Sequence, residues 1–375
     1  MHYIRTEAEL MDAAATLRGS DLIALDTEAA GYHRYHDRMC LLQLSTRIDT
    51  FLVDTLALPD IRLLEPLLAD EGREVVLHDA EYDLRLLRRD HAVRIDNLFD
   101  TKIAAQLLGE PAIGLAALVE KYLGFKMDKK HQRADWAQRP LPHEMLEYAA
   151  EDTKHLPRLR DRLREALESK GRWSWAQEEF NLRETADWMP PPPEPDAFLR
   201  IKNTRDLQPR QLAALRELHA WRESVASKRD VAPFRVVSND ILVAIARALP
   251  QDEASIARTP GVPGSIAERH GRDFMQALKA AAAVAPQDLP QRPRGPGRPA
   301  PDPELDKLVE RLKTARDAAA TELELDRGFL MPRQQLEDVA RSGARTLDQL
   351  GEVRDMRRWQ VEAMGNRLLA VLTAA

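Results

Sequence analysis

Two proline-rich segments divide the 375-residue chain and limit how it can fold. Residues 189–195 hold five prolines in seven positions, and residues 286–303 hold seven in eighteen. Proline has a fixed φ and no N–H to donate, so neither a compact helix nor a central strand tolerates this density. Such stretches favour extended polyproline geometry and separate domains. The sequence therefore predicts three domains, over residues 1–189, 196–285 and 302–375.

Charge and composition exclude several classes of protein. The formal net charge is −6, which divides into −9 over residues 1–189 (26 basic, 35 acidic) and +3 over residues 190–375 (29 basic, 26 acidic). An acidic chain is a poor candidate for coating nucleic acid indiscriminately. The single cysteine, Cys40, excludes an internal disulfide framework and cysteine-based metal sites.

Membrane and secretion signals are missing from the sequence. The longest apolar runs have six residues, whereas a span of the bilayer needs about 20. The first residues lack the basic start and apolar core of a secretion signal. We therefore expect a soluble, cytoplasmic protein with no membrane contact.

The first part of the chain mixes the two hydrophobic periods. Period-two patterns bounded by polar residues predict strands at 21–27, 40–45, 50–54 and 73–78. Helical patterns follow at 82–90, 101–108, 115–123 and 143–169. This order predicts an α/β domain, with a mixed sheet flanked by helices.

The rest of the chain shows only the helical period. Amphipathic helices are predicted at 207–225, 239–248 and 272–284, and again at 304–323, 334–341 and 356–372. Both groups run from a long helix through short ones to a closing helix. They predict two all-α bundles related by a weak internal duplication.

Asp26 and Glu28 lie two residues apart in the first predicted strand, so their side chains project from the same face. Two neighbouring carboxylates repel unless one is protonated or a cation lies between them. Hard cations such as Mg²⁺ take carboxylate oxygens as ligands. The pair alone is compatible with a metal site and also with a solvated strand end.

Asp83 follows the predicted strand 73–78, in the first turn of the next helix. Because the helix dipole favours an acid there, capping is its ordinary explanation. The strand–helix junction is also where α/β sheets place functional groups. Asp79 and Glu81 compete with it for such a role.

Tyr148 and Asp152 lie four residues apart, on one face of the predicted helix 143–169. A tyrosine in such a stripe ordinarily packs in the core. Asp152 beside it would then be an uncompensated acid, which favours a functional pair.

Together these residues resemble a known group of nucleases. Asp26-x-Glu28, Asp83 and Tyr148-x-x-x-Asp152, in this order and separation, resemble the tyrosine-containing subclass of the DEDD exonuclease superfamily. The surrounding sequence is similar to the ribonuclease D family at residues 24–29, 41–44, 99–105, 118–124, 135–141 and 148–153. The helical parts resemble HRDC domains, the first through Leu212-x-x-Leu-x-x-Leu-x-x-Trp-Arg222.

The resemblance implies a ribonuclease H-like exonuclease fold and a 3′–5′ exoribonuclease that releases 5′-mononucleotides. It implies two divalent ions, Mg²⁺ or Mn²⁺, with Asp26 bridging both, Glu28 and Asp152 completing the first site, and Asp83 supporting the second. Tyr148 would orient the attacking water, since a phenol with a pKa of about 10 is a poor base at neutral pH. The implied substrate is RNA, in particular tRNA precursors with 3′ extensions, and we expect a monomer.

Substrate contacts are less well marked in the sequence. Lys129, Lys130 and Arg133 form a basic cluster in a loop, where they could meet backbone phosphates or simply be solvated. The helical parts carry no comparable acidic cluster, so they are assigned to binding and not to chemistry.

Two other functions stay open at this point. One is a DNA-directed 3′–5′ exonuclease of the same mechanism, because only contacts to the ribose 2′-hydroxyl separate the two substrates. The other is a catalytically silent nucleic-acid-binding adaptor. The five acidic and tyrosine positions argue against the adaptor, which has no physical reason to keep repelling acids.

Overall fold

The computed structural model describes residues 1–128, 130–185, 196–292 and 302–374. The chain divides into two compact units, residues 1–28, 39–188 and 299–375 in one, residues 29–38 and 189–298 in the other. The prolines predicted to form a spacer at 189–195 lie outside the described residues, as do residues 293–301 of the second proline-rich segment.

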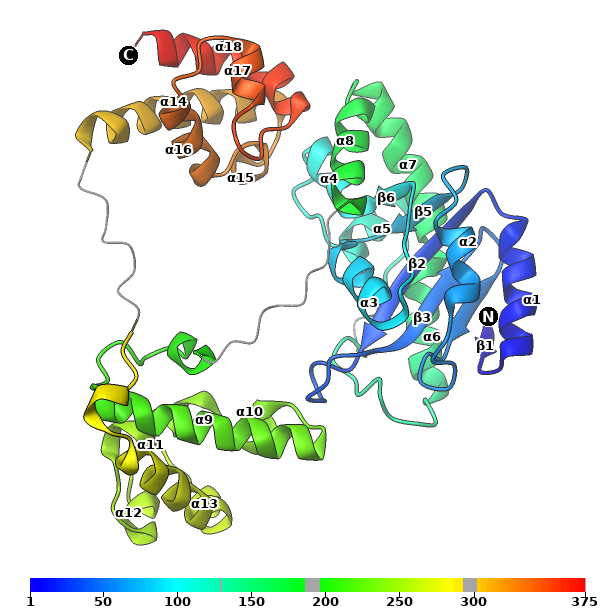
Figure 1. Cartoon of the computed structure of the whole chain (residues 1–375). Coiled ribbons are helices and arrows are strands. Elements are labelled where there is room, and N and C mark those ends of the chain that lie inside the picture. Colours follow the sequence, from blue (N-terminus) through cyan, green and yellow to red (C-terminus); the bar gives the residue numbers. More distant parts are fainter. Residues whose placement is uncertain (129, 186–195, 293–301, 375) are drawn as a thin grey trace. The chain divides into compact units, whose positions relative to one another are not determined.

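A six-stranded mixed sheet forms the centre of the first unit (Figure 1). Its order is β1-β4-β3-β2-β5-β6. The strands are β1 (His2–Ile4), β2 (Leu22–Ala29), β3 (Met39–Ser45), β4 (Thr50–Val53), β5 (Glu74–Leu77) and β6 (Leu98–Asp100). β1 and β4 pair in parallel, β3 and β4 antiparallel, and β2, β5 and β6 in parallel. The predicted α/β class is confirmed.

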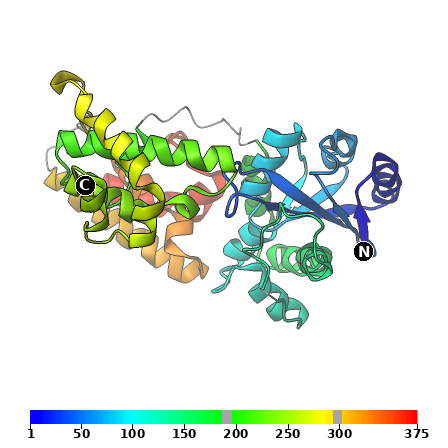
Figure 2. The ribbon, with the colours of Figure 1, turned by 90° about the horizontal axis from the view of Figure 1, so that it is seen from below.

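Helices cover both faces of this sheet, with α3 on one side and α6 and α7 on the other (Figure 2). The helices are α1 (Glu7–Arg18), α2 (Glu65–Leu68), α3 (Glu81–His91), α4 (Thr101–Leu108), α5 (Leu115–Leu123), α6 (His143–Lys154), α7 (Leu156–Ser169) and α8 (Trp173–Glu184). Double coverage explains why β2 begins with the fully buried apolar run Leu22–Leu25.

Some predicted elements differ from the observed ones. The single helix predicted over 143–169 is wrong: α6 ends at Lys154 and α7 begins at Leu156. Pro157 lies in the first turn of α7. Backbone N–H groups in the first turn have no carbonyl partner within the helix, so a proline there begins a helix, whereas in a continuous helix it would remove a hydrogen bond. The three-residue strands β1 and β6 are too short to show a period, and the sequence did not predict them.

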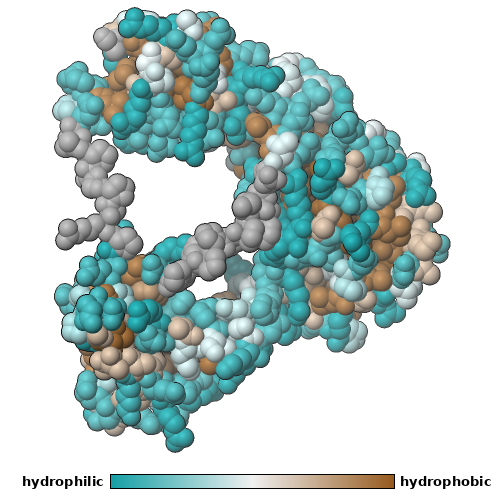
Figure 3. Space-filling view, in the orientation of Figure 1, coloured by the Kyte–Doolittle hydropathy of each residue, from teal (hydrophilic) through white to brown (hydrophobic). Residues whose placement is uncertain are grey.

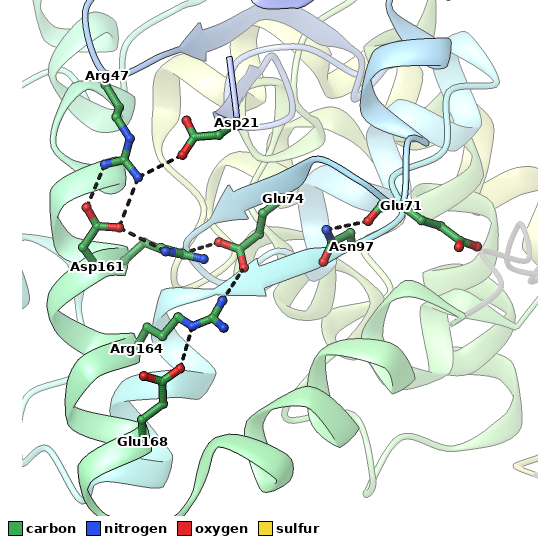
Figure 4. A network of polar contacts seen from close by, with 9 residues as sticks. Asp21, Arg47, Glu71, Glu74, Asn97, Asp161, Arg164 and Glu168 are labelled. Carbon is green, nitrogen blue, oxygen red and sulfur yellow. Dashed lines mark hydrogen bonds and ion pairs between the residues drawn. The ribbon is translucent and has the colours of Figure 1, made fainter. Parts of the chain in front are cut away.

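Ion pairs fasten α7 to the sheet (Figure 4). Arg47, in the turn between β3 and β4, bonds Asp161 of α7 at 2.7 Å. Arg160 of α7 bonds Glu74 at the start of β5, and Arg164 lies 3.7 Å from the same carboxylate. Glu74 is the first residue of β5, whereas Asp26 lies in the second half of the parallel strand β2. These ion pairs therefore stabilise the fold at the end of the sheet away from Asp26.

Two helical bundles complete the chain. The first contains α9 (Pro209–Arg229), α10 (Pro233–Val236), α11 (Asn239–Ala248), α12 (Glu253–Ala257) and α13 (Gly264–Ala283). The second contains α14 (Pro303–Leu323), α15 (Arg327–Leu330), α16 (Arg333–Ser342), α17 (Leu347–Gly351) and α18 (Arg358–Thr373). The closing helix predicted over 272–284 begins eight residues earlier, at Gly264.

A buried arginine repeats in the two bundles. Arg222 in α9 donates to the carbonyl oxygen of Val237, and Arg316 in α14 donates to that of Met331. Each acceptor lies fifteen residues after its arginine, and each arginine is at most 8% exposed. In both bundles a buried guanidinium at the same position therefore donates to the carbonyl oxygen of the residue that ends a short helix, α10 in the first and α15 in the second. This correspondence fits a duplicated unit.

The surface drawn in Figure 3 is mostly hydrophilic, with apolar residues in scattered patches. Large exposed apolar side chains such as Met11, Ile48 and Phe234 are far apart in the sequence. Across the described residues, the helices are too short or too polar to cross a membrane.

Asp100, at the end of β6, collects backbone groups from two segments. Its carboxylate accepts from the N–H groups of Lys102 and Ile103 as the N-cap of α4, and from those of Asp79 and Ala80, between β5 and α3. The side chain is buried, with 2% of the residue exposed. One carboxylate therefore fixes the connection that leads to Asp83.

Replacing Asp100 with Ala leaves four backbone N–H groups without this acceptor. We expect the free energy of unfolding to fall by about 2–4 kcal/mol, as for a lost N-cap plus further buried donors. Urea denaturation followed by tryptophan fluorescence measures the change. The exposed cap Thr6, which accepts from Glu9 at 3.3 Å, is the matched control; an equal loss for Thr6→Ala would contradict this account.

Candidate active site

Three carboxylates from two elements converge at one end of the sheet. β2 carries Asp26 and Glu28 on the same face, and α6 carries Asp152. One oxygen from each of these three residues lies within 4.8 Å of the others. Carboxylate oxygens this close are a donor set that suits a hard divalent cation such as Mg²⁺ or Mn²⁺. The chain therefore has an acidic cluster fit to hold a metal ion.

A cavity of about 390 Å³ opens over this cluster. Tyr148, one turn before Asp152 on α6, lines it together with the three carboxylates. The remaining walls come from segments far apart in the sequence: His78 after β5, the N-cap Gly114 and the first turn of α5, and Met127, Asp128 and Gln132 of the following loop.

Burial and neighbouring charges raise the pKa of all three carboxylates. Burial, and then the charges of Asp83, Asp152 and Glu28, raise the pKa of Asp26 well above its usual range. Burial and the charges of Asp152 and Asp83 raise the pKa of Glu28 in the same way. For Asp152, burial followed by the charge of Glu151 raises the pKa to about 7. A bound cation would relieve this repulsion, which is the electrostatic sign of a metal site.

Asp83 lies beside this group and is not one of its three converging oxygens. Its Oδ1 atom accepts a hydrogen bond of 2.5 Å from the hydroxyl of Thr27, the residue between Asp26 and Glu28. Burial raises the pKa of Asp83 to about 7, and the Thr27 hydrogen bond opposes that rise. The structure thus places Asp83 next to the cluster, electrostatically coupled to Asp26 and held by the same strand.

Tyr148 stands among aromatic rings at the edge of the cavity. Its ring centroid lies 5.6 Å from that of His131 and 6.2 Å from that of Trp136. Burial, and then the charges of Asp152, Glu28 and Asp26, raise the pKa of its hydroxyl far above the usual range. The phenol therefore stays protonated and can donate a hydrogen bond into the cavity.

A guanidinium anchors the loop that carries these rings. Arg139 donates to both carboxylate oxygens of Asp54 at 2.6 and 2.7 Å, and to the carbonyl oxygens of Cys40 and Trp136. Asp54 also accepts from the hydroxyl of Tyr3 at 2.6 Å and is 1% exposed. The bidentate pair fastens the loop to the end of β4, and the bond to Cys40 fastens it to the start of β3.

The predicted basic contacts lie in the same loop. Lys129 is outside the described residues, and Lys130 and Arg133 are exposed. The ammonium of Lys130 is 3.2 Å from the carboxylate of Asp128. Neither Lys130 nor Arg133 is among the described residues that line the cavity; Asp128 and Gln132 line it instead.

Sequence reasoning missed several residues that line or support the cavity. Thr27 is hidden inside the Asp26-x-Glu28 motif, and its role depends on a contact 56 positions away. His78 begins the segment His78–Asp83 that drew attention only for its acids. A histidine directly after a buried strand, five residues before a predicted helical acid, is the signal that could have identified it.

Comparisons with known proteins identify the families that the chain matches. The 3′–5′ exonuclease family matches residues 1–168, and the HRDC domain family matches twice, over residues 211–278 and 306–372. Ribonuclease D from Nitrobacter hamburgensis is 30% identical, over 99% of this chain and 95% of that protein.

Solved structures give the same result. Escherichia coli RNase D superposes with a TM-score of 0.68 at 26% identity, covering 99% of this chain and 98% of that one. The catalytic core of RRP6 from Trypanosoma brucei superposes with a TM-score of 0.68 at 30% identity, covering 76% of this chain and 80% of that one.

Asp26→Asn tests the repulsion directly. An acid whose pKa is raised by folding destabilises the protein above its unfolded pKa, so the cost here begins at about pH 4 and grows as the pH rises toward the raised pKa of Asp26 in the folded protein. We expect Asp26→Asn to raise the melting temperature of metal-free protein at pH 8 and to change it little at pH 4.5. Added Mg²⁺ should raise the wild-type melting temperature and leave that of the variant nearly unchanged, because the ion binds only the folded cluster.

Asp60→Asn is the control for that experiment. The pKa of Asp60 is lowered by a hydrogen bond from Arg62, so neutralising it removes no repulsion. A gain in melting temperature for Asp60→Asn like that of Asp26→Asn, or a wild type insensitive to Mg²⁺, would contradict the electrostatic account.

Proposed function

This chain belongs to the ribonuclease D family and is a 3′–5′ exoribonuclease, and we propose that it trims 3′ extensions from tRNA precursors by two-metal-ion hydrolysis. The observation that carries the proposal is the convergence of Asp26, Glu28 and Asp152 within 4.8 Å, in a cavity that Tyr148 also lines. The substrate is supported by the E. coli relative, which is described as an exoribonuclease involved in structured RNA processing. We also expect a cytoplasmic monomer.

Four carboxylates would together bind the metal ions. Asp26, Glu28 and Asp152 would bind one divalent ion, Mg²⁺ or Mn²⁺, and Asp83 would support a second from its place beside Thr27. When bound, such ions neutralise charge on the phosphodiester and make water a stronger nucleophile. Four carboxylates balance two divalent cations, so the proposed stoichiometry leaves no excess charge on the protein side.

Tyr148 would position the attacking water and would not remove its proton. Its raised pKa keeps the phenol protonated at neutral pH, so it can donate or accept a hydrogen bond but cannot act as a base. His131 and Trp136 flank its ring and would fix the direction of the hydroxyl.

The remaining parts would bind RNA. We keep the division into domains 1–189, 196–285 and 302–375, with the two helical ones holding substrate by tethering and not by chemistry. Arg200, Lys202 and Arg205 line one cavity of the first bundle and offer phosphate contacts there. Lys129, Lys130 and Arg133 would meet the backbone nearer the acidic cluster.

The direct test is nucleotide release from a tRNA precursor that carries a 3′ extension. We expect 5′-mononucleotides to appear one at a time, EDTA to stop their release, and Mg²⁺ or Mn²⁺ to restore it. A DNA strand of the same sequence as a short RNA should be degraded more slowly. Equal rates on the RNA and DNA strands would favour the DNA-directed alternative. If the short RNA is degraded but the tRNA precursor is not, the tRNA assignment is refuted.

Tyr148→Phe tests the positioning role. Turnover should fall by about 10²–10³-fold, in the range for a misplaced reacting group. The Kd for RNA, and the rise in melting temperature that Mg²⁺ causes, should both stay within about twofold of their wild-type values. Tyr122→Phe is the matched control, because that hydroxyl bonds Glu110 outside the cavity. RNA binding that falls in parallel with turnover would overturn this role.

A further inference from the structure

His78 lies beside the metal-binding acids without being one of them. β2 and β5 run parallel with Leu22 opposite Glu74 and Ala24 opposite Val76. Continuing this register by two residues sets His78, the first residue after β5, across from Asp26. Paired residues of parallel strands point to the same face, and His78 lines the cavity that Asp26 lines.

The ring of His78 is held in one tautomer. Thr101 donates its only hydroxyl proton to the carbonyl oxygen of Leu77 at 3.0 Å. With that proton on Leu77, the Thr101 oxygen presents a lone pair to the Nδ1 atom of His78, 2.9 Å away, and we assign the ring proton to that nitrogen. Nε2 is then the unprotonated nitrogen, a hydrogen-bond acceptor.

The backbone around His78 is fixed as firmly as its ring. Asp79 adopts a left-handed φ of 63°, and its N–H and that of Ala80 are held by the carboxylate of Asp100. Burial lowers the pKa of His78, which favours the neutral ring. Among the described residues, Thr101 is the one that hydrogen-bonds the ring, so Nε2 has its bonding capacity left for a ligand.

The chemistry of this position differs from that of the other cavity walls. Metal ions would occupy the carboxylates, and a protonated Tyr148 is a donor. A neutral acceptor beside them suits a hydroxyl group, which can donate where a phosphate oxygen cannot. The 3′ end of RNA brings two such groups into a 3′–5′ exonuclease site, the 2′- and 3′-hydroxyls of its last ribose.

We propose that Nε2 of His78 accepts a hydrogen bond from a hydroxyl of the terminal ribose, and that His78 is a specificity-determining residue for the sugar end of the substrate. Thr101 acts through His78 and is a positioning residue. This inference rests on the proposed function, because the RNA 3′ end must enter this cavity. A buried acceptor left unpaired by a deoxy sugar is what makes such discrimination effective.

Three RNA oligonucleotides that differ only in the last sugar provide the test: ribose, 2′-deoxyribose and 3′-deoxyribose. We expect wild-type kcat/KM for the first cleavage to be about 3- to 10-fold higher for ribose than for the sugar lacking the recognised hydroxyl, the size of one neutral hydrogen bond. The two deoxy sugars show which hydroxyl is read. In His78→Phe, kcat/KM for the oligonucleotide that ends in ribose should fall to the value for the sugar lacking the recognised hydroxyl, so that the preference is abolished.

Thr101→Val keeps the imidazole and removes the hydroxyl that bonds both its Nδ1 atom and the carbonyl oxygen of Leu77. We expect it to narrow the sugar preference, and we expect ¹⁵N NMR to show the Nδ1–H tautomer of His78 in the wild type and a mixture in the variant. His143→Asn, which removes an imidazole with 76% of its side chain exposed, is the control for both measurements. A retained preference in His78→Phe, an equal loss on all three sugars, or an Nε2–H tautomer in the wild type would overturn the proposal.

Failure of the proposed function would look different. A wild type inactive on every RNA would refute the nuclease assignment, whereas an active wild type without a sugar preference would refute only the role of His78. The tautomer measurement needs no activity and stands in either case.

Discussion

The close approach of Asp26, Glu28 and Asp152 is the constraint on which the candidate active site depends, because the fold must hold together groups that repel. Burial raises the pKa of all three, and neighbouring charges raise it further, those of the cluster for Asp26 and Glu28 and that of Glu151 for Asp152. Packing of α6 on β3 supplies the opposing force. Next to Asp152, the buried hydroxyl of Thr153 bonds that of Ser45 at 2.7 Å, and Ser45 bonds Thr50 at 2.8 Å. This chain of hydroxyls ties α6 to β3 and β4.

The other cavity walls depend on single charged groups that gather backbone atoms. Asp100 holds the N–H groups of Asp79 and Ala80, which connect His78 to Asp83. Arg139 holds the carbonyl groups of Trp136, in the loop beside Tyr148, and of Cys40 in β3. Each of these residues joins segments far apart in the sequence. A charge-assisted hydrogen bond is stronger than a neutral one, so few residues suffice to position these loops.

The sequence predicted what is local or carried by a recognisable motif. The α/β class follows from the two hydrophobic periods, and Asp26 and Glu28 share a face because a strand alternates. Pro157 marked the break between α6 and α7, but the apolar stripe continues across it and hid the change of helix. His78 could not be assigned from its neighbours, since its tautomer depends on Thr101, 23 positions away. Residues that act through such contacts leave no periodic signal.

An acidic cavity must still admit a polyanion. Two unit charges 4 Å apart interact by about 4 kcal/mol at an effective dielectric constant of 20, so three carboxylates alone would repel an RNA phosphate strongly. Lys130 does not cancel this charge, because it is paired with Asp128. Cations held by the same carboxylates would remove the repulsion, so metal ions and RNA must each raise the affinity for the other. This coupling reconciles the net charge of −9 over residues 1–189 with an anionic substrate.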